Sequence, residues 1–152
     1  MTPGHRRDFL LDSGAVSALA SDRNLLADYL QMFEHRYEGS MLIPVPVLTE
    51  VRTGDPRKDV LIDRLIKAIR TEAGVYLPLS PEAASRAGVL RTEALPLISA
   101  KEVLSTTDPQ IVGSAEERTA LCAVTIVTTD PKHIKLLVGR IRPTNIDVKV
   151  IG

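Results

Sequence analysis

Four acidic residues of this chain are placed as a carboxylate cluster would require, namely Asp12, Glu50, Asp108 and Asp130. Two carboxylates about 5 Å apart repel each other by roughly 3 kcal/mol at an effective dielectric constant near 20. A cluster of such groups therefore needs protons or cations. Hard cations such as Mg²⁺ and Mn²⁺ prefer oxygen ligands, and metal-assisted hydrolysis of a phosphodiester is the reaction that suits this arrangement.

The elements that must position these acids follow from an alternation of short apolar runs with amphipathic segments, which predicts a parallel sheet covered by helices. Strands are predicted over 9–11, 41–45, 75–79, 123–127 and 148–151. Helices are predicted near 25–33, 47–53 and 56–70, from 80, and from 108 to about 121, with a further helix cap at 129–131. The stretch 97–107 is ambiguous. Ligands bind beyond the carboxyl ends of parallel strands, so the acids that follow these strands are expected to converge there.

Composition and charge limit the class of protein. The chain has 152 residues, of which 44% are hydrophobic and 25% charged, and this predicts a single domain over residues 1–152. Lysine plus arginine and aspartate plus glutamate number 19 each. Any contact with nucleic acid must therefore come from a local patch and not from a strong overall positive charge.

The cysteine and histidine content indicates neither disulfides nor a zinc site. Cys122 is the only cysteine, which indicates a cytoplasmic location, and we interpret it as a core residue at the start of a strand. His5, His35 and His133 share no metal-ligand spacing and are interpreted as surface residues, with a contact to substrate left open for His133. The apolar run 9–11 is too short for a signal or membrane helix, so no membrane association is expected.

At the acidic residues the sequence resembles the PIN-domain family, and within it the VapC-type toxins of bacterial toxin and antitoxin pairs. The matching stretches are 9–15, 43–51, 108–115 and 126–130, in the same order across nearly the whole chain. The resemblance implies an α/β fold, a PIN-like three-layer α/β/α sandwich with a central parallel sheet. It also implies a divalent-metal site for Mg²⁺ or Mn²⁺ and endonucleolytic cleavage of RNA.

The resemblance assigns roles to individual residues. Asp12, Asp108 and Asp130 would be the metal ligands, and Glu50 would bind metal or orient its water. Thr128 matches the hydroxyl residue that precedes the last acid by two positions. Ser13 and Thr128 would support the ligands through their hydroxyls, and Ser13 is not expected to act as a nucleophile because no nucleophile elbow is present.

The chain departs from the family pattern in two places. Asp108 and Asp130 are about one helical turn further apart than the pattern has them, so Glu116 and Glu117, two turns beyond Asp108, become rival candidates. The aromatic residue that often follows the last acid is replaced by His133-Ile134.

Alternative interpretations remain for most of these residues. Asp12, Asp108 and Asp130 could be simple helix caps, although capping and metal binding can coexist in one carboxylate. Cations near the acids are candidate RNA phosphate contacts or merely part of a solvated face: Arg52, Arg118 and Lys132. The whole chain could also be a non-catalytic PIN-like module that binds RNA or protein. A phosphoacceptor domain is a third possibility, but the adjacent acids that it needs after the first strand are absent.

Two protein partners are expected besides an RNA substrate. The predicted helix near the N-terminus is apolar over more than one face, through Leu25, Leu26, Tyr29, Leu30, Met32 and Phe33, with Tyr37 just beyond. This pattern predicts a homodimer. The resemblance implies a small antitoxin, whose flexible C-terminal segment would lie in a groove between the early helices and the helix 56–70. A basic residue of that segment would neutralise the carboxylates.

Overall fold

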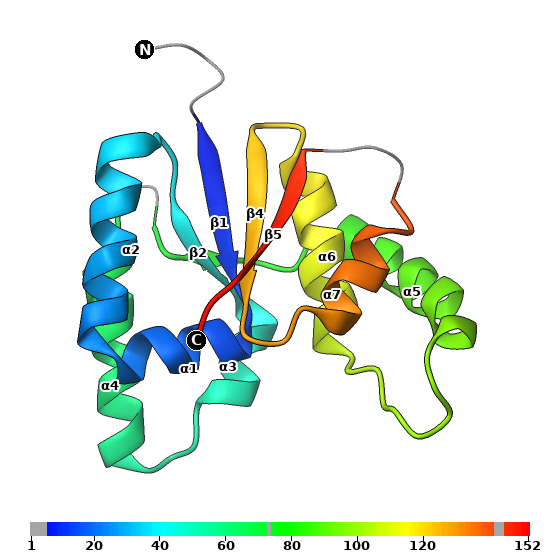
Figure 1. Cartoon of the computed structure of the whole chain (residues 1–152), viewed down its shortest axis with the longest axis horizontal. Coiled ribbons are helices and arrows are strands. Elements are labelled where there is room, and N and C mark those ends of the chain that lie inside the picture. Colours follow the sequence, from blue (N-terminus) through cyan, green and yellow to red (C-terminus); the bar gives the residue numbers. More distant parts are fainter. Residues whose placement is uncertain (1–5, 73, 142–144) are drawn as a thin grey trace.

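A five-stranded parallel sheet forms the centre of the fold (Figure 1). The computed structural model describes residues 6–72, 74–141 and 145–152. The strands are β1 (Arg7–Leu11), β2 (Met41–Pro44), β3 (Tyr76–Leu77), β4 (Ala123–Thr128) and β5 (Ile146–Val150). Their order is β3-β2-β1-β4-β5, and every neighbouring pair is parallel.

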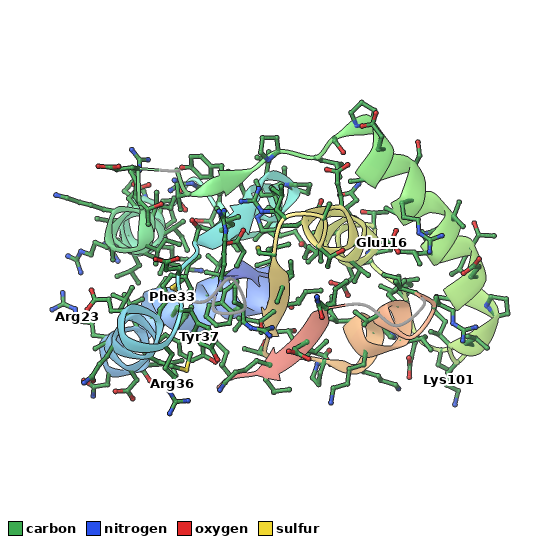
Figure 2. All side chains as sticks on the ribbon, turned by 90° about the horizontal axis from the view of Figure 1, so that it is seen from above. Arg23, Phe33, Arg36, Tyr37, Lys101 and Glu116 are labelled. Atoms are coloured by element: carbon green, nitrogen blue, oxygen red, sulfur yellow. The ribbon has the colours of Figure 1, made fainter. Side chains whose placement is uncertain are left out.

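Helices cover both faces of the sheet, as the two views show (Figures 1 and 2). One layer holds α1 (Ser13–Ser21), α2 (Arg23–Arg36) and α4 (Pro56–Ile69), with α3 (Val45–Val51) following β2. The other layer holds α5 (Pro81–Ala94), α6 (Thr107–Arg118) and α7 (Lys132–Val138), and a 3-10 turn, η2 (Leu95–Leu97), follows α5. The predicted three-layer α/β/α fold is confirmed. Within the described residues, no helix is both long and apolar enough to cross a membrane.

The strand order reverses at β1 and β4, and we call the region beyond the carboxyl ends of these two strands the crevice. The chain runs outward from β1 through β2 to β3, and it then returns to the other side of β1 with β4. Such a reversal is the point where ligands bind in open parallel sheets, beyond the carboxyl ends of the strands. Asp12 directly follows β1, and Asp130 comes two residues after β4.

The core lies on both faces of the two central strands. Leu10 and Leu11 of β1 and Ile126 and Val127 of β4 are fully inaccessible to solvent. Because helices cover both faces, these strands are nearly continuous apolar runs and do not alternate between apolar and polar residues. This packing fixes where each strand ends, and therefore where the acids after it stand.

Several predicted boundaries differ from the structure. The early helix is two helices, because Asp22 ends α1 and caps α2 by accepting from Asn24 N and Leu25 N at 3.0 Å each. The strand predicted over 75–79 is reduced to β3, and most of the ambiguous stretch 97–107 has no regular structure. Cys122 is half-buried and immediately precedes β4. His5 and the side chain of His35 lie outside the described residues.

Candidate active site

Asp12 stands at the crevice because it ends β1 and begins α1. Its Oδ1 accepts from Ala15 N at 2.8 Å, so the predicted helix cap is confirmed, and only 6% of the residue is exposed. Burial raises the pKa of the Asp12 carboxyl, and the charges of Glu50 and Asp130 raise it further. Hydrogen bonds from Thr128 and Ala15 partly oppose this rise. Asp12 is thus a buried anion among other anions.

Asp108 lies in the first turn of α6, and its carboxylate does not cap that helix. Thr106 is the N-cap residue and makes no side-chain cap, so the cap predicted at Asp108 is wrong. Burial is the main cause that raises the pKa of Asp108 to about 6, and the charges of Asp12 and Glu50 add to it. A hydrogen bond with Ser105 acts in the opposite direction. Glu50 is therefore an acid whose charge acts on both Asp108 and Asp12.

Glu50 and Asp130 are the exposed members of the group. Glu50 lies in the last turn of α3, and Asp130 lies in the turn between β4 and α7. The predicted cap at Asp130 is also wrong, since Pro131 is the N-cap residue of α7. The nearest backbone donor to Asp130 Oδ1 is Lys132 N, at the long distance of 3.5 Å. These two carboxylates therefore remain open to solvent at the rim of the crevice.

The hydroxyl of Thr128 connects two of the acids. Thr128 is fully buried, and Asp130 N donates to its Oγ1 at 3.1 Å. The single hydroxyl proton is donated either to the Asp130 carbonyl, at 3.0 Å, or to the Asp12 carboxylate. Ser13, the first residue of α1, is half-buried, and its supporting role stays a prediction.

Gly14 allows the turn after β1 to approach the turn after β4 closely. A Cβ atom at Gly14 would lie 2.2 Å from Thr129 Oγ1 and 3.5 Å from Asp12 Oδ1. Two atoms cannot approach to 2.2 Å without a bond, so any larger residue here would displace the Thr129 side chain. The two turns that carry Asp12 and Asp130 are therefore packed directly against each other.

Packing between α5 and α6 separates Asp108 from its rivals. Glu116 accepts from Arg86 Nε at 2.8 Å and from Arg86 Nη2 at 3.3 Å, and it lies on the side of α6 that faces α5 (Figure 2). Glu117 accepts from Ser80 Oγ at 2.7 Å. Both rivals are thus engaged with the N-terminal half of α5, and Asp108 is the acid of α6 that faces Asp12.

The three predicted phosphate contacts lie in different surroundings. Arg118 donates to the fully buried Asp8 at 2.7 Å, at the opposite end of β1 from Asp12. Arg52 pairs with Asp63 of α4 at 2.6 Å, which is the main reason that its pKa is raised. Lys132 lies two residues after Asp130 and pairs with Glu102. Of the three, Lys132 is the one that closely follows a proposed metal ligand, Asp130, in the chain.

The sequence analysis did not name Glu102, and it left open whether His133 contacts the substrate. His133 Nε2 lies 2.9 Å from Glu102 Oε2, and the charge of His133 slightly opposes the raised pKa of Asp108. The sequence signal that pointed to His133 as a residue of the site was its position shortly after Asp130. Glu102 lies in the ambiguous stretch 97–107, where periodicity gives no information about which way a side chain points.

The donor chemistry of the site fits a hard cation. Asp12, Asp108 and Asp130 offer carboxylate oxygens, and the pKa shifts of the first two show that negative charge is concentrated there. Among the described residues, no three His, Cys, Asp or Glu side chains are already arranged around one point to hold an ion. The fit to a hard cation therefore rests on the type of ligand atom, carboxylate oxygen, and on the mutual repulsion of these carboxylates.

Comparison with known proteins identifies the fold. No model of a known protein family matches the chain, and no curated protein does. Several solved structures match, and three of them have TM-scores of 0.66, 0.64 and 0.66. They are VapBC2 from Rickettsia felis bound to a DNA fragment from its promoter (16% identity), DNA-bound VapBC from Salmonella typhimurium (17%) and VapBC-1 from nontypeable Haemophilus influenzae (10%).

The coverage of these matches is nearly complete in both directions. The alignments span 95%, 94% and 94% of this chain and 99%, 97% and 97% of the matched chains, in the same order. Similarity at such low identity shows the fold and leaves the chemistry to be argued from the site. The chain has the PIN-like α/β fold seen in VapBC complexes.

Proposed function

We propose that this protein is a metal-dependent endoribonuclease of the VapC type, the toxin of a toxin and antitoxin pair. The observation that supports this proposal is the meeting of acids from separate elements at the reversal point of the sheet. Asp12 and Asp108 are 96 positions apart in the sequence, yet the charge of Asp12 helps to raise the pKa of Asp108. Keeping like charges together costs free energy, which a bound cation would offset.

Each acid has a distinct part in the proposed reaction. Asp12, Asp108 and Asp130 would hold Mg²⁺ or Mn²⁺, which supplies Lewis acidity and stabilises negative charge on the scissile phosphate when bound. Glu50 is solvent-exposed and would accept a proton from the attacking water. Ala15 N holds the Asp12 carboxylate through a hydrogen bond of 2.8 Å, and the Thr128 hydroxyl supports it when its proton points to Asp12 and not to the Asp130 carbonyl. The expected products carry a 3′-hydroxyl and a 5′-phosphate.

Cleavage of a mixed RNA pool tests the activity. The native protein with Mn²⁺ should cleave the pool, and Asp12→Asn should reduce the rate by about 100-fold or more, because transition-state charge would lose a metal ligand (about 2.7 kcal/mol or more). Asp28→Asn is the matched control, since Asp28 is an exposed acid of α2. Activity that persists in EDTA would exclude the metal mechanism. Binding without cleavage under every metal condition would favour the non-catalytic module.

A pocket lined in part by Glu50 supports the proposed antitoxin partner. It has a volume of about 320 Å³ and lies between α1, the end of α3 and α4. Residues that line it include Ser17, Ala20, Glu50, Val51, Leu61 and Ile62. An apolar segment of a partner would bind in this pocket with a basic residue reaching Glu50 and its neighbours. A peptide of this kind should raise the melting temperature of the native protein more than that of Asp12→Asn.

The proposed homodimer uses the apolar side chains of α2 and of Tyr37 that the rest of the chain covers only in part. Tyr29 is buried, whereas Leu25, Leu26, Leu30, Met32, Phe33 and Tyr37 are only partly covered within the chain. A second copy would cover this apolar surface. Light scattering at tens of micromolar should therefore give twice the mass of the chain, and a strictly monomeric mass would contradict the proposal. The cytoplasm is the location that this function implies.

A further inference from the structure

Two nitrogen donors at the start of α7 point at one carboxylate. Lys132 Nζ contacts Glu102 Oε1, and His133 Nε2 lies 2.9 Å from Glu102 Oε2. Glu102 comes from the loop between η2 and α6, 30 positions earlier in the chain than Lys132. Each oxygen of the carboxylate thus has its own donor. We call these three side chains the Glu102 contact. Lys132 and His133 follow directly after the turn that carries Asp130, and the charge of His133 acts on Asp108.

Two of the three side chains in the Glu102 contact, Lys132 and His133, are nitrogen donors, whereas the four side chains of the crevice are carboxylates. Hydrogen bonds from Lys132 and then from His133 lower the pKa of Glu102, so this carboxylate is ionised at neutral pH. An ionised carboxylate only accepts hydrogen bonds, so His133 Nε2 carries a proton and donates it in either charge state of the ring. Lys132 and His133 therefore present N–H donors that select an anion and repel a metal ion.

We propose that Lys132 and His133 form a binding site for an RNA phosphate and that Glu102 occupies this site in the free protein. This inference rests on the proposed function. A phosphodiester, like a carboxylate, offers two anionic oxygens that accept from a lysine and an imidazole. Because Lys132 and His133 begin α7 immediately after the turn that carries Asp130, the phosphate bound there belongs to a nucleotide next to the scissile one. Glu102 then competes with the substrate.

The geometry allows Glu102 to leave without disturbing the core. The side chains of Lys132, His133 and Glu102 are 68%, 19% and 28% exposed, so solvent reaches the contact. Leu104 is buried and anchors the loop, whereas Val103 between it and Glu102 is 86% exposed. Ion pairs that solvent reaches contribute little to stability, so rotating Glu102 away costs little. A phosphate can therefore displace Glu102 by rotation of the Glu102 side chain alone.

The test compares RNA binding by charge-matched variants. A labelled mixed-sequence RNA is titrated with protein in EDTA, so that binding is measured without cleavage. Glu102→Gln should bind about two- to fivefold more tightly than the native protein, which is the range expected for losing one exposed ionic competitor. Glu38→Gln makes the same charge change at the exposed residue opposite Arg6, at the far end of the sheet, and should bind like the native protein.

A double-mutant cycle separates competition from a structural role. Lys132→Ala should weaken binding more in the Glu102→Gln background than in the native background, because Glu102 masks Lys132 only in the latter. The slope of log affinity against log salt concentration should also become steeper in Glu102→Gln, by an amount approaching 0.7 for each newly available phosphate contact. A residue that only held the loop would change neither the coupling nor the slope.

The outcomes distinguish this inference from the proposed function. If Glu102→Gln binds RNA no more tightly than the native protein while the native protein still cleaves RNA, the competition is excluded and the nuclease remains. If no variant binds RNA and the native protein cleaves none, both proposals are overturned. Should Glu102→Gln unfold, the Lys132→Ala and Lys132→Glu variants decide the matter, because unchanged RNA affinity in both would exclude a phosphate site.

Discussion

Strand β1 has a buried aspartate near its start and another just after its end, and the two have opposite surroundings. Asp8 is fully buried and accepts from Arg118 Nε at 2.7 Å and from Ser40 N at 2.9 Å. Asp12 is almost as inaccessible, but the charged groups that affect its pKa are the acids Glu50 and Asp130. Asp8, at one end of β1, is paired with a cation, whereas Asp12, just after the other end, is not paired with one in the described part of the chain.

This difference separates a structural carboxylate from a functional one. A buried charge costs several kcal/mol of desolvation unless a partner compensates it, and Arg118 does so for Asp8 within the chain itself. Asp12 has the hydrogen bond from Ala15 N and, when the Thr128 hydroxyl proton points to it, one from Thr128, but no cation among the described residues. The remaining compensation must come from a proton, a metal ion or a basic partner. Burial alone would have ranked the two aspartates together, whereas their neighbours distinguish them.

The largest expected effect is on the free energy of unfolding, and it comes from the Asp8 end of β1, where Arg118 pairs with the buried carboxylate. Arg118→Met should lower the free energy of unfolding by about 3 kcal/mol, because it leaves Asp8 buried without a cation. Asp12→Asn in the metal-free protein should leave that free energy unchanged or raise it, since one repelling charge is removed. Urea unfolding in EDTA measures both. A loss in Asp12→Asn as large as that in Arg118→Met would show that the two ends do not differ.

The second expected effect is a pH dependence of the free energy of unfolding, which comes from Asp108 in the crevice. The pKa of Asp108 is about 6 in the folded protein and 3.8 in the ordinary, unfolded reference. The folded state therefore holds this proton more tightly, so its contribution to stability is complete below pH 4 and is lost as pH rises through about 6. The metal-free protein should lose roughly 1–3 kcal/mol over this range, less than full burial would give because the carboxyl is partly exposed.

Asp108→Asn is the variant that isolates this titration. It should flatten the pH dependence between about 4 and 6 in EDTA, and millimolar Mg²⁺ should oppose the loss in the native protein, because the cation binds the ionised form. Thermal unfolding at several pH values gives the curve. An identical curve for the native protein and Asp108→Asn would mean that the crevice acids are not coupled as inferred.

The sequence was sufficient to predict the strand ends and insufficient for contacts between distant segments. Asp12 and Asp130 follow buried apolar runs, and that local pattern placed both at the carboxyl edge of the sheet. The choice between Asp108 and Glu116 could not be made locally, because they lie on one helix and Arg86 of α5 determines which of them is engaged elsewhere. The role of Arg118 was missed because its partner is 110 positions away.

The loops and caps show the same limit. An Asp followed by proline predicts a helix cap, but α6 begins one residue before Asp108 and α7 begins two residues after Asp130. Local preference for capping is weak compared with the packing that sets where a helix begins. Both acids consequently face the crevice and do not cap backbone N–H groups, and this difference makes them available as ligands.

The smallest expected effect compares two glycines, one beside each aspartate. A Cβ at Gly39 would lie 2.1 Å from the backbone oxygen of Arg7, next to Asp8, whereas a Cβ at Gly14 would meet the side-chain oxygen of Thr129, next to Asp12. Backbone cannot yield, so Gly39→Ala should cost about 1–3 kcal/mol. A threonine side chain can rotate, and alanine favours a helix over glycine by up to about 1 kcal/mol, so Gly14→Ala should change stability by less than about 1 kcal/mol.

The double variant makes this last comparison decisive. Thr129→Ala removes the atom that the new methyl group would meet, so Gly14→Ala together with Thr129→Ala should be more stable than Thr129→Ala alone by the gain in helix propensity, up to about 1 kcal/mol. The contact of Gly14 with Thr129 joins the turn after β1 to the turn after β4, so cleavage should fall in Gly14→Ala and stay low even where stability recovers. Full cleavage by a stable Gly14→Ala would mean that the spacing of these two turns does not position the acids.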